Sequence, residues 1–169
     1  MRVKLIVTSF LLLLFTTVIG NSTNDDFRNN FLGSMDKCYL EYYKNNPGSI
    51  VVPKKFVIGI AIHESNWGRS RIASVSNNLY GMKTTSTDPK HFVYALGGSH
   101  IKLAKYDNRC GSVRDFINLM TKDERYSSVN DYFAKARKVD YEKVLGLMDI
   151  YYEDIHWPTK VLNIIKGLK

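Results

Sequence analysis

The stretch PKKFVIGIAIHESNWGRS, residues 53–70, decides the fold of this chain. Its centre, from Phe56 to Ile62, is apolar on nearly every side of a helix. A helix of this kind is typical of the middle of a domain, where neighbours cover all of its faces. Pro53 suits the opening of a helix, because its fixed φ angle already fits. We therefore predict a buried helix over residues 54–66.

Glu64 lies on the same face as the apolar residues of this helix, at its last turn. Partial burial beside an aromatic side chain such as Trp67 would raise the pKa of the carboxyl, which suits a general acid. The alternative is a structural one, in which Glu64 forms a salt bridge with Arg69 or Arg71 at the end of the helix. The pattern of this helix leaves both interpretations open.

The sequence after this helix predicts a short helix and then a change to β-structure. The short helix covers residues 69–74, and Asn77 and Asn78 end it, because asparagine tolerates the left-handed conformation at a helix exit. Residues 91–106 are rich in β-branched and aromatic side chains around two glycines at 97–98. This composition favours a hairpin.

The rest of the chain has the apolar spacing of helices. Upstream, this spacing predicts a first packed helix between Phe31 and Tyr43, and downstream Ser112 is a candidate N-cap. The downstream helical segments are residues 113–120, 132–137, 141–150 and 158–168. We expect an α+β fold, mostly helical, in which one domain over residues 31–169 carries a small β-lobe inserted after the central buried helix.

The N-terminal residues have the layout of a secretory signal peptide. Arg2 and Lys4 precede an apolar run over residues 5–19, which is short for a membrane span of about 20 residues. We predict a signal peptide at residues 1–20 and a flexible polar leader at residues 21–30. The chain is then exported, to the periplasm or beyond, and its mature form has no integral membrane span. An uncleaved anchor is the alternative.

The composition is that of an ordinary globular protein, with 44% hydrophobic and 24% charged residues among 169. Its 24 bases outnumber its 16 acids, and 22 bases remain after residue 20. This surplus favours an anionic partner, which could be nucleic acid, lipid or cell-wall polymer. Export excludes the usual nucleic-acid roles, and no motif of that class is present.

The two cysteines, Cys38 and Cys110, are interpreted through the predicted export. In an oxidising compartment a pair of cysteines more often forms a disulfide than a metal site or a nucleophile. We predict a disulfide between them. Two buried free thiols are the alternative.

The segments AIHESNWGRS at 61–70 and NNLYGMK at 77–83 strongly resemble the glucosaminidase family of peptidoglycan hydrolases, glycoside hydrolase family 73. Residues 106–116 and the terminal YYED at 151–154 are also similar to that family, so the resemblance covers roughly residues 53–167. The order of the segments suggests the Bax-like periplasmic branch. The resemblance implies a lysozyme-like fold and hydrolysis of the β-1,4 bond after N-acetylglucosamine in peptidoglycan.

The resemblance also implies roles for individual residues. Glu64 matches the catalytic acid, and Tyr151 matches a tyrosine near the reacting sugar, although Tyr152 is one residue away and is the alternative equivalent. Aromatic rings stack on sugar faces, and the paired asparagines match residues that shape the cleft floor. The candidates for substrate binding are Trp67, Asn77, Asn78, Tyr80 and Tyr152. The alternative is that the aromatic rings lie in the core and the asparagines form a turn.

The second carboxylate is where the sequence departs from the family pattern. Asp88 is the sole acid between Glu64 and Tyr106, and Asp107 follows directly. Both suit turns, and Asp88 precedes a proline. If a protein base is needed, Asp88 is the candidate, and otherwise the substrate's own acetamido group assists. The stereochemical outcome is therefore left open.

Two other functions compete with the glucosaminidase interpretation. A lytic transglycosylase shares the fold and the catalytic Glu, but residues 78–83 differ from the Gly-Leu-Met-Gln signature of that class. A glycan-binding protein without turnover is the non-enzymatic alternative. A zinc-protease helix is excluded, because Trp67 stands where the second histidine is needed. We expect a monomer that acts on peptidoglycan strands and uses no cofactor or metal.

Overall fold

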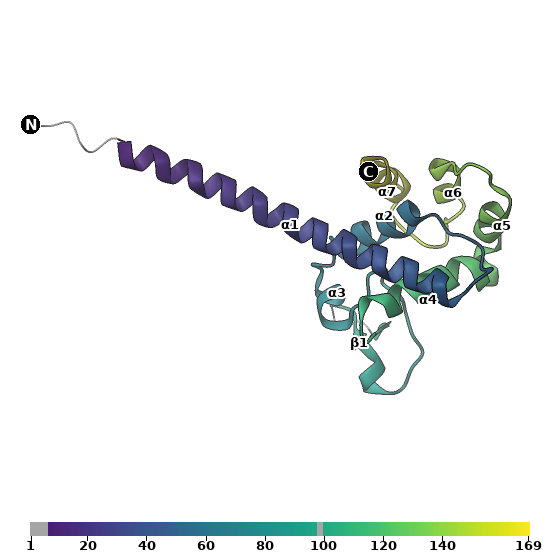
Figure 1. Ribbon diagram of the computed structural model, residues 1–169. Helices are drawn as coiled ribbons and strands as arrows, with labels where there is room; N and C mark the ends of the chain where they lie inside the picture. Colours follow the sequence, from purple (N-terminus) through teal and green to yellow (C-terminus); the bar gives the residue numbers. More distant parts are fainter. Residues whose placement is uncertain (1–6, 98–99) are drawn as a thin grey trace, which may run out of the picture.

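The computed structural model describes residues 7–97 and 100–169, with side chains from residue 24 onward. The chain is mostly helical, with one small two-stranded sheet (Figure 1). The helices are α1 (Val7–Asn45), α2 (Lys54–Ser65), α3 (Arg71–Ser76), α4 (Arg109–Lys122), α5 (Ser127–Lys135), α6 (Tyr141–Gly146) and α7 (Trp157–Gly167). The strands are β1 (Phe92–Tyr94) and β2 (Lys102–Ala104), and the 3-10 turns are η1 (Pro89–His91) and η2 (Glu124–Tyr126).

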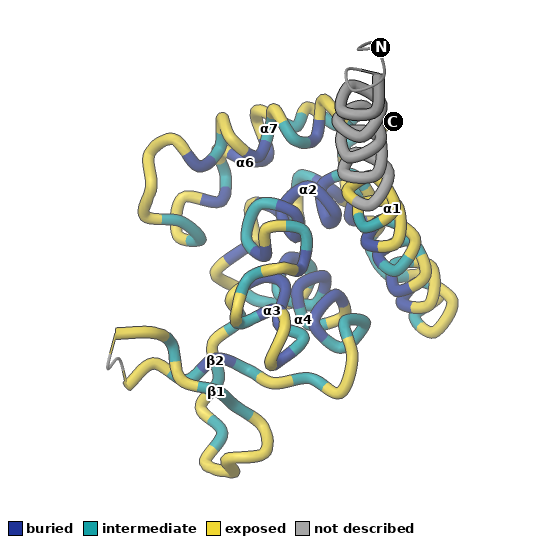
Figure 2. Tube along the Cα trace, turned by 90° about the vertical axis from the view of Figure 1, so that its left-hand side faces the viewer, coloured by how far each residue is buried: buried dark blue, intermediate teal, exposed yellow. Residues whose placement is uncertain are grey.

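Helix α2 forms the centre of the domain, as its apolar sequence predicts. Its residues from Phe56 to Ile62 are all buried, and the ring of Phe56 meets Phe133 at 5.2 Å between centroids. Figure 2 shows α2 among the other buried segments, with the hairpin of β1 and β2 at one end of the molecule. On one side α2 packs closely against α7, because Gly59 leaves room for Ile165.

The predicted leader differs from the structure in its described part. Residues 24–30 continue helix α1, although their polar composition suggested a flexible segment. The guanidinium of Arg28 lies 5.1 Å from the centroid of the Trp67 ring, and that of Arg69 lies 3.8 Å from the centroid of Phe27. These cation–π contacts with the turn after α2 explain the order of this segment, and a composition count cannot anticipate them.

The predicted signal peptide, residues 1–20, lies outside the part of the chain whose side chains are described. Its removal on export stays a prediction. Among the described residues, no helix combines the length and the apolar character needed to cross a membrane.

The disulfide between Cys38 and Cys110 is confirmed. It joins α1 to the first turn of α4 across 72 residues of sequence, with the two Cα atoms 4.7 Å apart. A closed loop of this length stabilises the fold by about 4 kcal/mol in the chain-entropy model. Because α1 packs along α4, the disulfide fastens two helices that are already in contact.

The β-lobe is the segment between α2 and α4, as predicted. Strands β1 and β2 pair antiparallel, with Val93 opposite Leu103, and an isolated bridge joins Lys83 to Leu103. The helix that follows begins earlier than expected, because Asn108 caps α4. Ser112, the predicted cap, is buried, and its hydroxyl instead accepts a 3.0 Å hydrogen bond from the backbone N–H of Leu79.

Candidate active site

Glu64 stands in the last turn of α2 and is half-buried. The helix stops directly after it because three consecutive residues, Asn66, Trp67 and Gly68, have positive φ angles of 48°, 60° and 77°. Residues other than glycine rarely adopt this left-handed conformation. Interactions with neighbouring residues must therefore compensate for the free-energy cost at Asn66 and Trp67.

Ser65 supplies those interactions at the end of the helix. Its buried hydroxyl donates to the carbonyl of Ala61 at 2.5 Å and accepts from the N–H of Gly68 at 2.7 Å. The backbone N–H of Ser70 closes the turn on the carbonyl of Ser65 at 2.8 Å. The Ser that follows Glu64 in the sequence therefore fixes where the helix ends, and with it the position of the carboxyl group.

The carboxyl group of Glu64 has its hydrogen-bond partner at the start of α7. The indole Nε1–H of Trp157 donates to Oε1 of Glu64 at 2.6 Å, and Trp157 is only 4% exposed. A buried indole N–H needs an acceptor, and here the carboxylate provides it. The alternative of a salt bridge is wrong, because Arg69 contacts Phe27 and Arg71 donates to the backbone carbonyl of Tyr94.

Two tyrosines complete an aromatic group around Trp157. Tyr152 stacks on the indole with 4.8 Å between ring centroids and 10° between the planes. The ring of Tyr151 meets the indole at 5.4 Å, and both tyrosines are half-buried. Their partial exposure leaves aromatic surface near Glu64 for a sugar ring to contact.

The hydroxyl of Tyr151 connects this aromatic group to the β-lobe. It donates to the backbone carbonyl of Tyr80 at 3.0 Å, across 71 residues of sequence. Burial raises the pKa of Tyr151 well above its usual range, and the negative charge of Glu64 raises it further. The phenol therefore stays protonated at physiological pH, and its hydrogen bond to the β-lobe persists.

Trp67, which the sequence led us to expect beside the carboxyl of Glu64, packs against α1. Its ring meets Phe31 of α1 at 5.9 Å and lies under Arg28. The left-handed turn directs Trp67 toward α1, whereas Trp157 reaches Glu64 from α7. Trp67 lines a cavity together with Arg28 and His63, and its role in substrate binding stays a prediction.

Tyr80 is also placed differently from its expected role as a substrate-binding residue. Its ring is 3% exposed and stacks on Phe116 with 4.1 Å between centroids, and its hydroxyl donates to the carbonyl of Val57. A buried ring offers no surface to a sugar. Only the backbone carbonyl of Tyr80 reaches the site, through Tyr151.

Asn77 and Asn78 bind the backbone of the β-lobe with their side-chain amides. Asn77 ends α3 in the left-handed conformation, as predicted, and its Nδ2 donates to the carbonyls of Tyr106 and Asp107. The Nδ2 of Asn78 donates to the carbonyls of Met82 and Ala104, and its Oδ1 accepts from the N–H of Met82. Both residues therefore shape the lobe, which favours the turn interpretation over direct contact with a sugar.

Asp88 lies in the β-lobe as the cap of η1. Its Oδ1 accepts a 2.9 Å hydrogen bond from the N–H of Lys90, and His91 lies 3.8 Å from its other oxygen. Both of these partners of the Asp88 side chain lie within its own turn. The turn interpretation of Asp88 therefore fits the structure.

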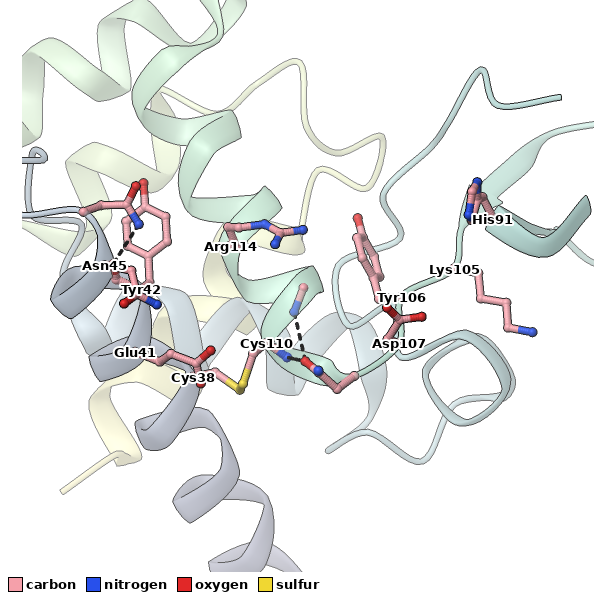
Figure 3. A pocket seen from close by; sticks show the side chains of 13 residues that line it. Cys38, Glu41, Tyr42, Asn45, His91, Lys105, Tyr106, Asp107, Cys110 and Arg114 are labelled. Atoms are coloured by element: carbon pink, nitrogen blue, oxygen red, sulfur yellow. Dashed lines mark hydrogen bonds between the residues drawn. A yellow bond between two sulfur atoms is a disulfide. The ribbon is translucent and has the colours of Figure 1, made fainter. Parts of the chain in front are cut away.

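A cavity with a volume of about 570 Å³ lies between α1, the start of α4 and the exit of the β-lobe. Figure 3 shows the disulfide of Cys38 and Cys110 beside it, with Tyr106 and Asp107 facing it from the opposite side. Neither Glu64 nor any of the aromatic residues around it lines this cavity. The chemistry of Glu64, rather than the size of a cavity, identifies the candidate active site.

Trp157 is the residue that sequence reasoning failed to select for the site. The available signal was a tryptophan directly before a proline at the start of a predicted helix. That signal places Trp157 at the N-terminus of α7 but does not say which residue lies opposite. The contact with Glu64 depends on how α7 packs on α2.

Comparison with known proteins identifies a family for this chain. Residues 40–169 match the sequence profile of a family described as glucosaminidase, mannosyl-glycoprotein endo-beta-N-acetylglucosaminidase. No curated protein sequence matches significantly.

Solved structures share the fold. The catalytic domain of the autolysin Auto from Listeria monocytogenes has a TM-score of 0.63 and 19% identity, over 87% of this chain and 93% of that one. A peptidoglycan hydrolase from Sphingomonas sp. A1 has a TM-score of 0.64 and 22% identity, over 82% and 87% of the two chains. The glycoside hydrolase domain of FlgJ from Salmonella typhimurium has a TM-score of 0.59 and 19% identity, over 82% and 86%.

Proposed function

The chain belongs to the glucosaminidase family of peptidoglycan glycoside hydrolases, and we propose that it is an exported enzyme that cleaves the β-1,4 bond after N-acetylglucosamine, with Glu64 as the general acid. The observation that carries this proposal is the half-buried carboxyl of Glu64, held by Trp157 within an aromatic group that can receive a sugar ring.

The hydrogen bond from Trp157 assigns different tasks to the two oxygens of Glu64. Oε1 accepts the indole N–H at 2.6 Å, so the carboxyl cannot turn freely. The proton to be delivered is then carried on Oε2. Cleavage requires that this proton reach the glycosidic oxygen as the bond to the sugar breaks, while positive charge builds up on the sugar ring.

Tyr151 is proposed to act beside the reacting sugar. Its proton is donated to the carbonyl of Tyr80, and its phenolic oxygen keeps lone pairs that can face the developing positive charge. Tyr152 is proposed to contact a sugar face with the part of its ring that Trp157 leaves uncovered. Tyr151 is proposed as the equivalent of the family tyrosine, because its hydroxyl connects the aromatic group around Trp157 to the β-lobe.

We propose that the substrate's own acetamido group replaces a second protein carboxylate: its carbonyl oxygen bonds to the anomeric carbon as the leaving oxygen takes the proton of Glu64. The ionised Glu64 then accepts a proton from the water that attacks the same carbon and opens the ring. The side chain of Asp88 is engaged as a turn cap, with Lys90 and His91 as partners. Substrate assistance of this kind is an established exception to the usual pair of carboxylates. One protein carboxyl, Glu64, then suffices for the reaction.

Export is supported by the disulfide of Cys38 and Cys110 together with the N-terminal sequence. Disulfides persist in oxidising compartments and are rare in the cytosol. Peptidoglycan is assembled outside the membrane, so an exported chain meets this substrate.

Digestion of purified peptidoglycan, followed by mass spectrometry of the fragments, tests this function. We expect fragments with reducing N-acetylglucosamine ends from the wild-type chain and none from Glu64→Gln. Anhydromuropeptides would instead show a lytic transglycosylase. Binding to peptidoglycan without any fragments would show a protein that recognises glycan without turnover.

A further inference from the structure

The positive charge of this protein is concentrated in the β-lobe and its flanking turns, residues 65–106. This segment contains six bases, and Asp88 is its one acid. The rest of the chain after residue 20 is nearly balanced, with 16 bases and 15 acids in residues 21–64 and 107–169. Nearly all the charge surplus of the expected mature chain therefore lies in a quarter of its length. The bases of the segment are Arg69, Arg71, Lys83, Lys90, Lys102 and Lys105.

The bases of this lobe also lack acidic partners. Among the described residues, every ion pair between a lysine or arginine and a carboxylate lies outside residues 65–106. Within the lobe, Lys83, Lys90 and Lys105 are exposed, and none of them forms an ion pair. Their charges are therefore free to act on an external anion.

The backbone places these three lysines on adjacent segments of the β-lobe. Lys83 forms a bridge with Leu103 of β2, and the N–H of Lys105 donates to the carbonyl of His91 at 2.9 Å. Lys90 directly precedes His91. The three cations thus belong to segments that border the small sheet, and together they contribute to the positive field of the lobe.

This basic sheet is connected to the candidate active site. The carbonyl of Tyr80, three residues before Lys83, accepts the hydrogen bond of Tyr151. Tyr151 in turn packs against Trp157, which holds Glu64. The β-lobe is thus attached to the candidate active site, and a substrate as long as a glycan strand can contact both.

We propose that the lysine cluster of the β-lobe, Lys83, Lys90 and Lys105, binds the carboxylates of the stem peptides on the glycan strand under cleavage. This inference rests on the proposed function, because it takes peptidoglycan as the substrate. The sugars of an intact strand are neutral where they carry peptides, so the anionic groups available to lysine are the peptide carboxylates. The enzyme then selects strands that carry peptides.

Binding of the Glu64→Gln chain to insoluble peptidoglycan, measured by co-sedimentation, tests this proposal. The peptidoglycan is first freed of phosphate-containing wall polymers, and one portion has its carboxylates converted to neutral methylamides. The lobe variant adds Lys83→Gln, Lys90→Gln and Lys105→Gln. The control variant instead adds Lys44→Gln, Lys122→Gln and Lys166→Gln, which are exposed, form no ion pair and lie outside the lobe.

We expect the lobe variant to bind native peptidoglycan about tenfold more weakly, which is the summed effect of three exposed charge pairs. The control variant, with the same net charge, should change by less than about twofold. On the methylamide form the lobe variant should match its parent. Equal losses in both variants, no loss in either, or an undiminished loss on the methylamide form would each overturn the proposal. Thermal melting of both variants verifies that they fold.

A failure of this proposal can be told apart from a failure of the proposed function. The binding comparison uses the Glu64→Gln chain and does not depend on turnover. If the wild-type chain releases no reducing ends while the lysine effect is present, the activity is wrong and the recognition stands. If reducing ends appear but the lysine variants bind normally, the recognition is wrong and the activity stands.

Discussion

The indole N–H of Trp157 donates a 2.6 Å hydrogen bond to Oε1 of Glu64, across 93 residues of sequence. The two residues lie at facing ends of α2 and α7, helices that pack closely along Gly59 and Ile165. The position of the carboxyl group therefore depends on the packing of α7 against α2 as well as on the turn that ends α2. The predictions below test this dependence and the chemistry that it supports.

Replacing Glu64 with Gln should lower the rate of hydrolysis by at least about 100-fold, because an amide cannot supply the proton that the leaving oxygen needs. The amide keeps an oxygen that can accept the indole N–H, so folding and glycan binding should change little. Release of reducing ends measures the rate, and thermal melting measures stability. Activity within about threefold of wild type would refute the general-acid role.

Replacing Trp157 with Phe keeps an aromatic ring between α7 and α2 but removes the donor to Glu64. Leaving an acceptor in a partly buried site without its donor costs about 1–3 kcal/mol, so the turnover number should fall by about tenfold. KM should change less, because Tyr151 and Tyr152 remain. Steady-state kinetics on soluble glycan fragments separate these two effects. An unchanged turnover number in a folded variant would show that Trp157 does not position the carboxyl.

Two substitutions at Asp88 separate a turn cap from a catalytic base. Asn caps helices as well as Asp does, so Asp88→Asn should leave both turnover and melting temperature nearly unchanged. Asp88→Ala removes the cap and should cost up to about 1 kcal/mol of stability, with little effect on turnover. A 100-fold loss of turnover in Asp88→Asn at an unchanged melting temperature would establish a protein base instead.

Removal of the disulfide by the double change Cys38→Ser and Cys110→Ser should lower the free energy of unfolding by about 4 kcal/mol. For a domain of this size, the melting temperature should fall by about 10 °C. Calorimetry of the oxidised wild type and the double variant measures the shift. Thiol titration of denatured exported protein should find no free thiol, and two reactive thiols would contradict the pairing.

Adding a methyl group at Gly59 should loosen the contact between α2 and α7. A Cβ atom at this position meets Cγ1 of Ile165 at 2.5 Å, so Gly59→Ala should destabilise the fold by about 1–3 kcal/mol. Combining it with Ile165→Ala removes the clash. The double variant should then lose less stability than the sum of the losses in the two single variants. Urea unfolding of the four forms gives the coupling. Strict additivity would mean that the two side chains do not meet.

The sequence determined the elements that depend on local pattern. The apolar run around Ile60 predicted the buried helix, and the glycines near residue 97 predicted the hairpin, because periodicity and turn chemistry act over a few residues. The predicted export favoured a disulfide, and Cys38 pairs with Cys110. Glu64 stood out as a carboxyl in line with an apolar helix face, and the resemblance to the glucosaminidase family favoured the general-acid role, which stays a prediction.

Only the tertiary structure decided which aromatic side chain meets that carboxyl. Trp67 is three residues from Glu64, yet its left-handed backbone turns it toward α1, whereas Trp157 arrives on a helix 93 residues away. The burial of Tyr80 and the helical order of residues 24–30 have the same origin. Each depends on a partner distant in sequence, and spacing along one segment holds no information about such a partner.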